Sequence, residues 1–201
     1  MNIEKDFLYV KEQALVSLEK AQSENKLDSK IKPILDIINN SDDYYTSSSC
    51  AGRIVLLEIP SIGDKKHARF LGKWHDIVKP NDVFSAAKKA RNGILWLLAQ
   101  SPIIHVAASS SEAADKLVKT AVAGGFKNTA FKFTKKKIIV EICSTERLDA
   151  PIGRDSNLFC SGEYLQLLVD IANEVIEKSN VKIHRLEEKL RKSLSTQKTT
   201  T

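Results

Sequence analysis

The sequence contains little cysteine. Its three cysteines, Cys50, Cys143 and Cys160, are far apart along the 201 residues. A disulfide framework needs pairs and a CxxC metal site needs close spacing, so this distribution argues against both and indicates reduced thiols in a cytoplasmic protein. The four histidines are equally scattered, and we therefore expect no metal site.

The sequence also lacks long apolar runs and the short motifs of common enzymes. No apolar run approaches the roughly 18 residues that a membrane-spanning helix needs. The beginning, MNIEKDFLYVKEQ, mixes acids and bases, so we expect neither membrane association nor secretion. The absence of Gly-x-Gly-x-x-Gly, of a Walker lysine loop and of Gly-x-Ser-x-Gly argues against a Rossmann cofactor site, a P-loop and a serine-hydrolase elbow.

Composition and charge limit the size of the fold and the kinds of partner that we expect. Hydrophobic residues make up 42% of the chain, enough for one large domain or two small intertwined ones. The net charge is +6, and residues 178–201 hold seven Lys or Arg against two Glu, which is five of those six charges. Such a segment attracts phosphate backbones. A solvated helix end that complements its own dipole is the alternative, and composition leaves both open.

Hydrophobic periodicity and turn residues predict helices mixed with strands. Helices are predicted over 3–21, 34–39, 83–92 with Asn81 or Asp82 as cap, 112–123, and from Gly162 to about Leu194. Strands are predicted over 53–59, 67–78, 103–107, 127–133 and 137–143. Residues 94–99 are ambiguous, residues 144–151 are assigned to a loop, and residues 195–201 are expected to be disordered.

The order of these elements predicts an α+β fold. A helix, a polar loop and two strands occur over 31–78, and a similar series recurs over 112–143. We therefore predict a pseudo-duplicated domain over 1–194, with halves at about 31–108 and 109–178 and a basic C-terminal helix at 179–194. Its mixed sheet would be flanked by helices. Because helices do not separate all the strands, a doubly wound parallel sheet is disfavoured.

The segment YYTSSSCAGRIVLLEI, residues 44–59, is the first candidate for a ligand site. It is compatible with an ordinary loop that enters a strand, with a solvated serine-rich turn, or with a polar floor for a ligand. Serine hydroxyls both donate and accept hydrogen bonds, Gly52 permits close approach of the backbone, and Arg53 can bind a carboxylate or phosphate. For Cys50, a small buried thiol is favoured over a nucleophile.

Two histidines are further candidates. His75 follows Trp74, and this pair suits stacking on a base or another aromatic ligand, although a core tryptophan with a satisfied histidine is the alternative. His105 lies between Ile104 and Val106 in an apolar strand, where a core histidine is the plainer interpretation.

Two loops complete the set. The Gly-Gly-Phe-Lys-Asn-Thr segment at 124–129 can present backbone N–H groups to an anion, or simply end a helix. Residues 144–151 hold two acids, a base and two hydroxyls directly after an apolar strand. Acids commonly hold ribose hydroxyls, and a capped, solvated loop is the alternative.

Taken together, these segments occur in an order that resembles the tRNA wybutosine-synthesizing protein 3 family, in its short archaeal-type form. The string Ser48-Ser-Cys-Ala-Gly-Arg53 is the most distinctive part, and the resemblance covers nearly the whole chain. The other matching segments are His75, His105-Val106, Gly125-Phe-Lys-Asn128, Ser144-Thr-x-x-Leu-x-x-Pro151, Glu163-Tyr164 and Ala172-Asn173. The chain departs from the family at Cys143, where a basic residue is common, so no charge role is carried over there.

The resemblance implies an S-adenosylmethionine-dependent methyltransferase with a cofactor site unlike that of common methyltransferases. Its substrate would be a wyosine-type tricyclic base beside the anticodon of phenylalanine tRNA, at position 37, and the methyl group would go to ring nitrogen N4. Such a transfer depends on in-line placement of the reactants and on a group that accepts a proton.

Site roles are implied residue by residue. The implied catalytic residues are Ser49, Arg53, His75 and His105. The implied cofactor contacts are Ser48, Cys50, Gly52, Phe126, Asn128, Ser144 and Thr145. Lys127 would line the wall opposite the serines, and Asp149 would help to close the site. Arg53 would bind the methionine carboxylate or a tRNA phosphate, and one of the two histidines would relay a proton or orient the base.

Two other classes of function compete with this one. A non-catalytic RNA-binding module would need only the basic helix and the Trp74-His75 pair, and a saturable S-adenosylmethionine site would argue against it. A cysteine-dependent hydrolase would use Cys50 with one of the histidines.

We predict that Cys50→Ser retains methyl-transfer activity, because the thiol has no histidine beside it in sequence to activate it. The check is the methyl-transfer rate of the variant together with titration of the Cys50 thiol in the wild type. A low thiol pKa and an inactive variant would favour the hydrolase.

Overall fold

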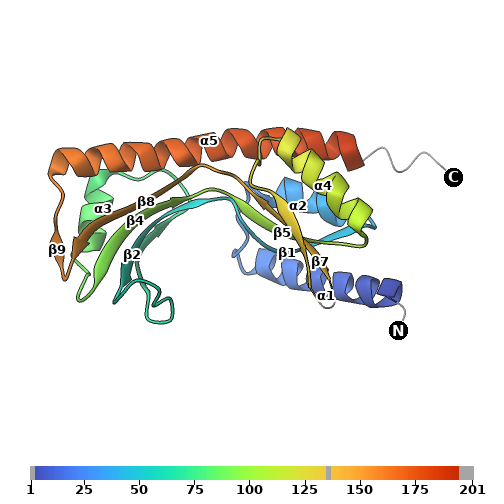
Figure 1. Cartoon of the computed structure of the whole chain (residues 1–201), viewed down its shortest axis with the longest axis horizontal. Helices are drawn as coiled ribbons and strands as arrows, with labels where there is room; N and C mark the ends of the chain where they lie inside the picture. The colour runs from blue at the N-terminus through green and yellow to red at the C-terminus, as the bar shows by residue number, and fades with distance from the viewer. Residues whose placement is uncertain (1–2, 135–136, 195–201) are drawn as a thin grey trace. The chain divides into compact units, whose positions relative to one another are not determined.

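The computed structural model describes residues 3–134 and 137–194, which form two compact units (Figure 1). Unit 1 consists of the described residues in Met1–Ala51, Pro102–Thr145 and Asn180–Thr201, and unit 2 consists of Gly52–Ser101 and Glu146–Ser179. The two units are interleaved along the chain, whereas the halves at 31–108 and 109–178 follow one another. The similarity of those halves remains a prediction.

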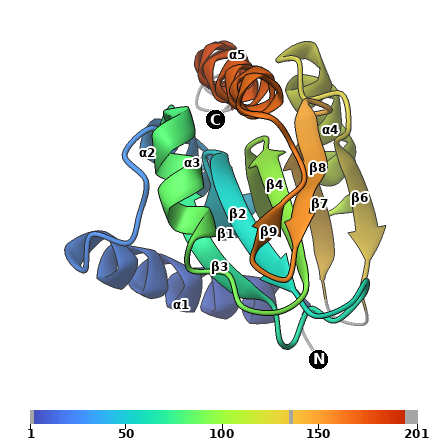
Figure 2. The same ribbon diagram turned by 90° about the vertical axis from the view of Figure 1, so that its left-hand side faces the viewer.

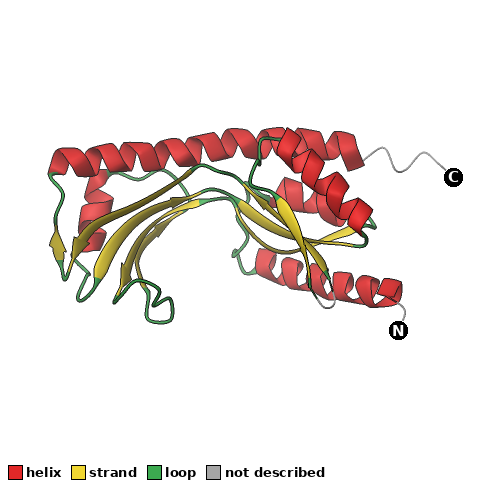
Figure 3. Cartoon of the chain, in the orientation of Figure 1, coloured by secondary structure: helices red, strands yellow, loops and turns green. Residues whose placement is uncertain are grey.

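Unit 1 contains a four-stranded sheet in the order β1-β5-β7-β6. Every strand pair in it is antiparallel. Its strands are β1 (Tyr44–Cys50), β5 (Ile103–Ala108), β6 (Ala130–Phe133) and β7 (Ile138–Cys143), and its helices are α1 (Ile3–Ser23), α2 (Lys32–Asn39) and α4 (Ser111–Ala123) (Figure 3).

Unit 2 contains a five-stranded sheet in the order β3-β2-β4-β8-β9, again with antiparallel pairs. Its elements are β2 (Arg53–Ile59), β3 (Arg69–Trp74), α3 (Pro80–Ala87), β4 (Ile94–Gln100), β8 (Arg147–Arg154) and β9 (Asn157–Leu158). The helix α5 (Gly162–Leu194) is continuous and contributes its residues up to Ser179 to unit 2 and the rest to unit 1.

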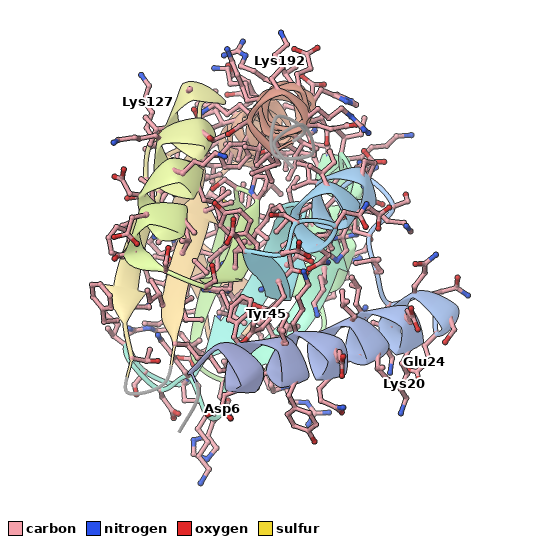
Figure 4. All side chains as sticks on the ribbon, turned by 90° about the vertical axis from the view of Figure 1, so that its right-hand side faces the viewer. Asp6, Lys20, Glu24, Tyr45, Lys127 and Lys192 are labelled. Atoms are coloured by element: carbon pink, nitrogen blue, oxygen red, sulfur yellow. The ribbon has the colours of Figure 1, made fainter. Side chains whose placement is uncertain are left out.

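Helices cover both faces of the sheet in unit 1. One face packs Ile104, Val106 and Val140 against apolar residues of α2, α4 and α5. Because side chains alternate along a strand, Tyr44 joins this core and Tyr45 points to the other face. There Tyr45 lies beside α1 (Figure 4). Its ring meets that of Phe7, with ring centroids 5.1 Å apart.

The sheet of unit 2 has one covered face. Ile54, Leu56 and Leu97 point to a core that α3 and the first part of α5 complete (Figure 2). On the opposite face, no helix of unit 2 packs among the residues that the structure describes.

Glu58 is a buried carboxylate of unit 2, with 2% of its surface exposed. It accepts hydrogen bonds from Arg69 and from the backbone N–H groups of residues 91 and 92.

The α+β class, the non-Rossmann fold and the long C-terminal helix are confirmed. The strands form two antiparallel sheets where we expected one mixed sheet, because strand partners are chosen by tertiary packing that sequence spacing does not encode. Residues 144–151, predicted as a loop, enter β8. The ambiguous residues 94–99 form β4. The serine-rich residues 44–50 form β1.

Helix α3 differs from the prediction at both ends. It begins at Pro80, so Lys79 is the N-cap residue and neither Asn81 nor Asp82 takes that position. The Asp82 carboxylate instead accepts a hydrogen bond from Lys79 N at 2.9 Å. The helix ends at Ala87 and not at Asn92.

The C-terminal part of α5 is a core element as well as a basic one. Ile183, Leu186 and Leu190 are at most 3% exposed in the core of unit 1. Removing everything after Asn180 would therefore open that core, so single charge substitutions are the better test of RNA contact. The predicted disordered tail, 195–201, lies outside the described residues. None of the described helices meets the length and apolarity that crossing a bilayer requires.

The buried phenol of Tyr44 yields a prediction for stability at high pH. Tyr44 is 1% exposed and donates a hydrogen bond to Ala113 O at 2.8 Å. Burial, with the negative charge of Asp43 second, raises the pKa of Tyr44 from 10.0 to about 12. Between these values the folded chain keeps a proton that the unfolded chain loses, so stability falls as pH rises. We expect a loss of roughly 2–3 kcal/mol by pH 12.

The measurement is urea unfolding of wild type and Tyr44→Phe from pH 8 to pH 12. The free-energy difference between them should be constant below pH 10 and shrink above it. A difference that stays constant to pH 12 would contradict a buried, protonated Tyr44.

Candidate active site

A row of three polar side chains crosses the sheet of unit 1. In the strand register, Ser48 of β1 lies opposite His105 of β5, and His105 lies opposite Glu141 of β7. A bulge between Thr46 and Ser48 sets this pairing. We call Ser48, His105 and Glu141 the polar row.

The polar row is joined by hydrogen bonds. Ser48 Oγ is 2.8 Å from His105 Nδ1, and His105 Nε2 is 3.0 Å from Glu141 Oε2. An ionised carboxylate only accepts, so Nε2 carries the hydrogen that it donates to Glu141. In the neutral ring Nδ1 is then an acceptor, and Ser48 donates to it. This is an arrangement through which a proton can move from the serine to the imidazole.

Alternation along the strands places the polar row away from the core. His105 lies between the buried Ile104 and Val106, and Glu141 lies between the buried Val140 and Ile142. The histidine side chain is 30% exposed, so a ligand can reach this face. Lys132 Nζ is 3.7 Å from the same Glu141 oxygen.

The predicted serine floor is divided between two faces. Ser49 lies opposite Ile104, so its side chain points to the core side while that of Ser48 points to His105. Cys50 returns to the face of Ser48 and lies in the next row, with Ile103 and Cys143. Of the predicted segment, Ser48 and Cys50 therefore share the face of the polar row.

A second group of polar residues lies at the C-terminal end of β7. Lys182 Nζ of α5 donates to Ser144 Oγ at 2.9 Å, and Ser144 is 4% exposed. Asn128 N donates to Cys143 O at 3.2 Å, which places the Asn128 loop beside the end of β7. The Asn128 and Thr145 side chains are exposed, as is Lys127.

Phe126 requires a correction. It is 0% exposed and belongs to the core of unit 1. Such a side chain has no surface for a ligand, so the cofactor contact expected of Phe126 is withdrawn. Its place in the sequence, directly after the helix-ending Gly125 with φ of +99°, suits an apolar residue that anchors the turn.

Unit 2 holds the remaining predicted residues. Arg53 Nε donates to Gln100 Oε1 at 2.8 Å, which fixes the direction of the guanidinium. His75 Nδ1 is 3.2 Å from Gly52 O, and Gly52 has φ of +99°. Because a carbonyl oxygen only accepts, the ring donates here and ties β3 to the start of β2. Asp149 forms an ion pair with Arg147 on β8.

Sequence reasoning missed three contributors: Glu141, Gln100 and Lys182 as a partner of Ser144. Glu141 had a usable signal, because it interrupts the apolar run Ile-Ile-Val-Glu-Ile as His105 interrupts its own strand. Gln100 and Lys182 gave none, since their roles depend on which strand and helix they meet.

Comparison with known proteins identifies the family of this chain. The sequence profile of the family described as methyltransferase TYW3 matches residues 9–192. The chain belongs to this family. A Pyrococcus horikoshii relative named tRNA(Phe) 7-((3-amino-3-carboxypropyl)-4-demethylwyosine(37)-N(4))-methyltransferase 1 is 45% identical over 94% of this chain and 97% of its own length. A Methanocaldococcus jannaschii relative named as a methyltransferase of the same base is 38% identical over 86% of this chain and 91% of its own.

Solved structures support the same family fold. The PH1069 protein from Pyrococcus horikoshii matches with a TM-score of 0.88 at 44% identity, covering 94% of this chain and 98% of its own. A hypothetical protein from Aeropyrum pernix matches with a TM-score of 0.72 at 22% identity, covering 83% and 99%, and supports the fold alone. The family resemblance seen in the sequence is thereby confirmed.

We predict that Glu141→Gln lowers kcat for methyl transfer about 10-fold with little change in KM. The amide still accepts a hydrogen bond from His105, but it has no negative charge to stabilise a protonated ring. The proton-transfer step should therefore be slower. The measurement is steady-state kinetics. Asp115→Asn is the matched control, because it removes one carboxylate of unit 1 that pairs only with Lys119 among the contacts described. Equal kcat values for the two variants would contradict the role of Glu141.

Proposed function

We propose that this protein transfers a methyl group from S-adenosylmethionine to N4 of a wyosine-type tricyclic base at position 37 of phenylalanine tRNA, in the cytoplasm. The relatives named for this reaction match almost the whole chain. The observation in this structure that carries the proposal is the polar row, because methylation of a ring nitrogen that bears hydrogen requires a proton acceptor.

The proposed reaction balances at the polar row. The substrate N–H bond breaks, its electron pair forms the new N–CH3 bond, and the electrons of the broken C–S bond stay with sulfur. Ser48 Oγ accepts the released proton as its own proton passes to His105 Nδ1, 2.8 Å away. Glu141 then faces an imidazolium and balances its charge. The side chains thus take up one proton, and the positive ring that results lies against the Glu141 carboxylate.

The methyl donor supplies an electrophilic methyl group when bound, and the polar residues after β7 fit its other groups. Its amino-acid carboxylate matches the ammonium of Lys182, which Ser144 holds at 2.9 Å. Its ribose hydroxyls match the exposed amide of Asn128 and hydroxyl of Thr145. Cys50, on the face of the polar row, would contribute a small apolar contact. These roles are part of the proposal.

The histidine of unit 2 has a different role in this proposal. His75 donates to a backbone carbonyl, so it positions the glycine before Arg53, while His105 handles the proton. Arg53 offers its two terminal nitrogens to an anionic group of the tRNA.

The decisive experiment mixes purified protein with labelled S-adenosylmethionine and phenylalanine tRNA that carries the demethylated tricyclic base. We expect label on that base alone, read by mass spectrometry of the nucleosides, and none on the same tRNA with unmodified guanosine. His105→Gln, which cannot take up the proton, should lower the rate about 100-fold or more.

Two controls keep the outcome interpretable. Donor binding by calorimetry should survive in His105→Gln, which shows that the variant is folded. No transfer by the wild type, with both donor and tRNA bound, would contradict the proposed reaction.

A further inference from the structure

One face of the sheet in unit 2, on which none of the described helices of this unit packs, carries an aromatic row. In the strand register Phe70 lies opposite Leu57, Leu57 opposite Trp96, and Trp96 opposite Pro151. We call Phe70, Leu57, Trp96 and Pro151 the aromatic row. Their neighbours in sequence Leu56, Leu95 and Ile152 are at most 2% exposed in the core, so alternation directs the row to the opposite face.

Cations border the aromatic row on both sides. The next rows contain Lys73, opposite Val55, and Arg53, opposite Gln100, which itself lies opposite Arg147. On the other side Arg154 lies opposite Ile94. Asp149, paired with Arg147, is the carboxylate in these rows. The face is therefore apolar and aromatic across its middle and positively charged along its edges.

Phe70 is an exposed member of the aromatic row, and two cations lie over its ring. Phe70 lies on the edge strand β3 and is 54% exposed. Lys73 Nζ is 4.7 Å from its ring centroid, and Arg53 Cζ is 5.9 Å from it. Exposing a phenylalanine does not stabilise the fold. An exposed ring with two cations close to it can stack on an RNA base while the cations bind the neighbouring phosphates.

We propose that this face binds single-stranded RNA, with the Phe70 ring stacked on an unpaired base and Arg53 and Lys73 on the adjoining phosphates. The inference rests on the proposed function, because the occupant to which it commits is the anticodon loop of the substrate tRNA. The charge favours this occupant: four cations surround the aromatic row against one carboxylate. Sheets that present aromatic side chains on an open face commonly recognise single-stranded RNA in this way.

The chain offers a matched control for Phe70. Phe84 is 46% exposed in the same unit and has Lys88 Nζ 4.9 Å from its ring centroid. It lies on α3, which packs on the other face of the sheet. The two phenylalanines are thus alike in exposure and cation contact and differ in the face that they occupy.

The test measures the Kd for the unmodified anticodon stem-loop of phenylalanine tRNA by fluorescence anisotropy. Phe70→Ala should weaken binding about 5- to 100-fold, Phe70→Trp should restore it, and Phe84→Ala should leave it unchanged. Lys73→Met should reduce the salt dependence of binding. Because this assay needs neither methyl donor nor turnover, a failure of the proposed reaction would not affect it.

Trp96 provides a second readout on the same face. Trp74, the other tryptophan, packs against the core, so Trp74→Phe leaves Trp96 as the single fluorophore. The stem-loop should quench its emission, and Phe70→Ala should shift that quenching to higher RNA concentration. Equal effects of Phe70→Ala and Phe84→Ala on Kd would overturn the proposal. So would dimerisation of the wild type that Phe70→Ala abolishes with RNA affinity unchanged, since the face would then belong to a second copy of the chain.

Discussion

The position of His105 in β5 is the constraint on which the candidate site depends. β5 is paired on both sides, with β1 and with β7, and its neighbours Ile104 and Val106 are completely buried. A slip of one residue would turn the histidine into the core and both apolar residues out of it. The apolar core therefore fixes the register, and the register delivers Ser48 and Glu141 to the two ring nitrogens. Burial of Ile104 and Val106 therefore also aligns the polar row.

The same design principle operates in each unit separately. Each sheet packs one face against helices through buried aliphatic residues, and each carries a candidate functional row on the other face. In unit 1, helix α1 also packs on that second face, at Tyr45. In unit 1 that second face holds the polar row, which suits proton transfer. In unit 2 it holds aromatic and basic residues, which suit recognition of a larger anionic partner. Family membership accounts for a methyltransferase. In our proposals, the face in unit 1 carries the chemistry and the face in unit 2 recognises the RNA.

The predictability of the site from sequence differed from residue to residue. His105 was visible as a polar interruption in an apolar strand, and the Ser-Ser-Cys-Ala-Gly-Arg string was visible as a family mark. The partner of His105 was not, because Glu141 is 36 residues away and only the pairing of β5 with β7 brings them together. Phe126 was misjudged because a phenylalanine beside two glycines looks the same in sequence whether it faces a ligand or a core.

The fold shows the same limit. Helices with clear periodicity, such as α1 and α4, were predicted closely because their signals are local. The strand β1 was missed because a run of serines is typical of turns. In the structure, Tyr44 at its start is buried and Thr46 N donates to Asn39 Oδ1 at 2.8 Å. β8 was missed because Pro151 and Asp149 disfavour a strand, and its pairing with β4 overrides that preference.

The central claim is that His105 donates from Nε2 to Glu141 and accepts at Nδ1 from Ser48. The most direct measurement is a long-range 1H–15N correlation spectrum of protein labelled at histidine nitrogen, with His105 assigned by comparison with His105→Gln. The account predicts the pattern of an Nε2–H tautomer for His105 at neutral pH. A ring protonated at Nδ1 instead would contradict it, because the serine would then have no acceptor and the proposed proton route would be closed.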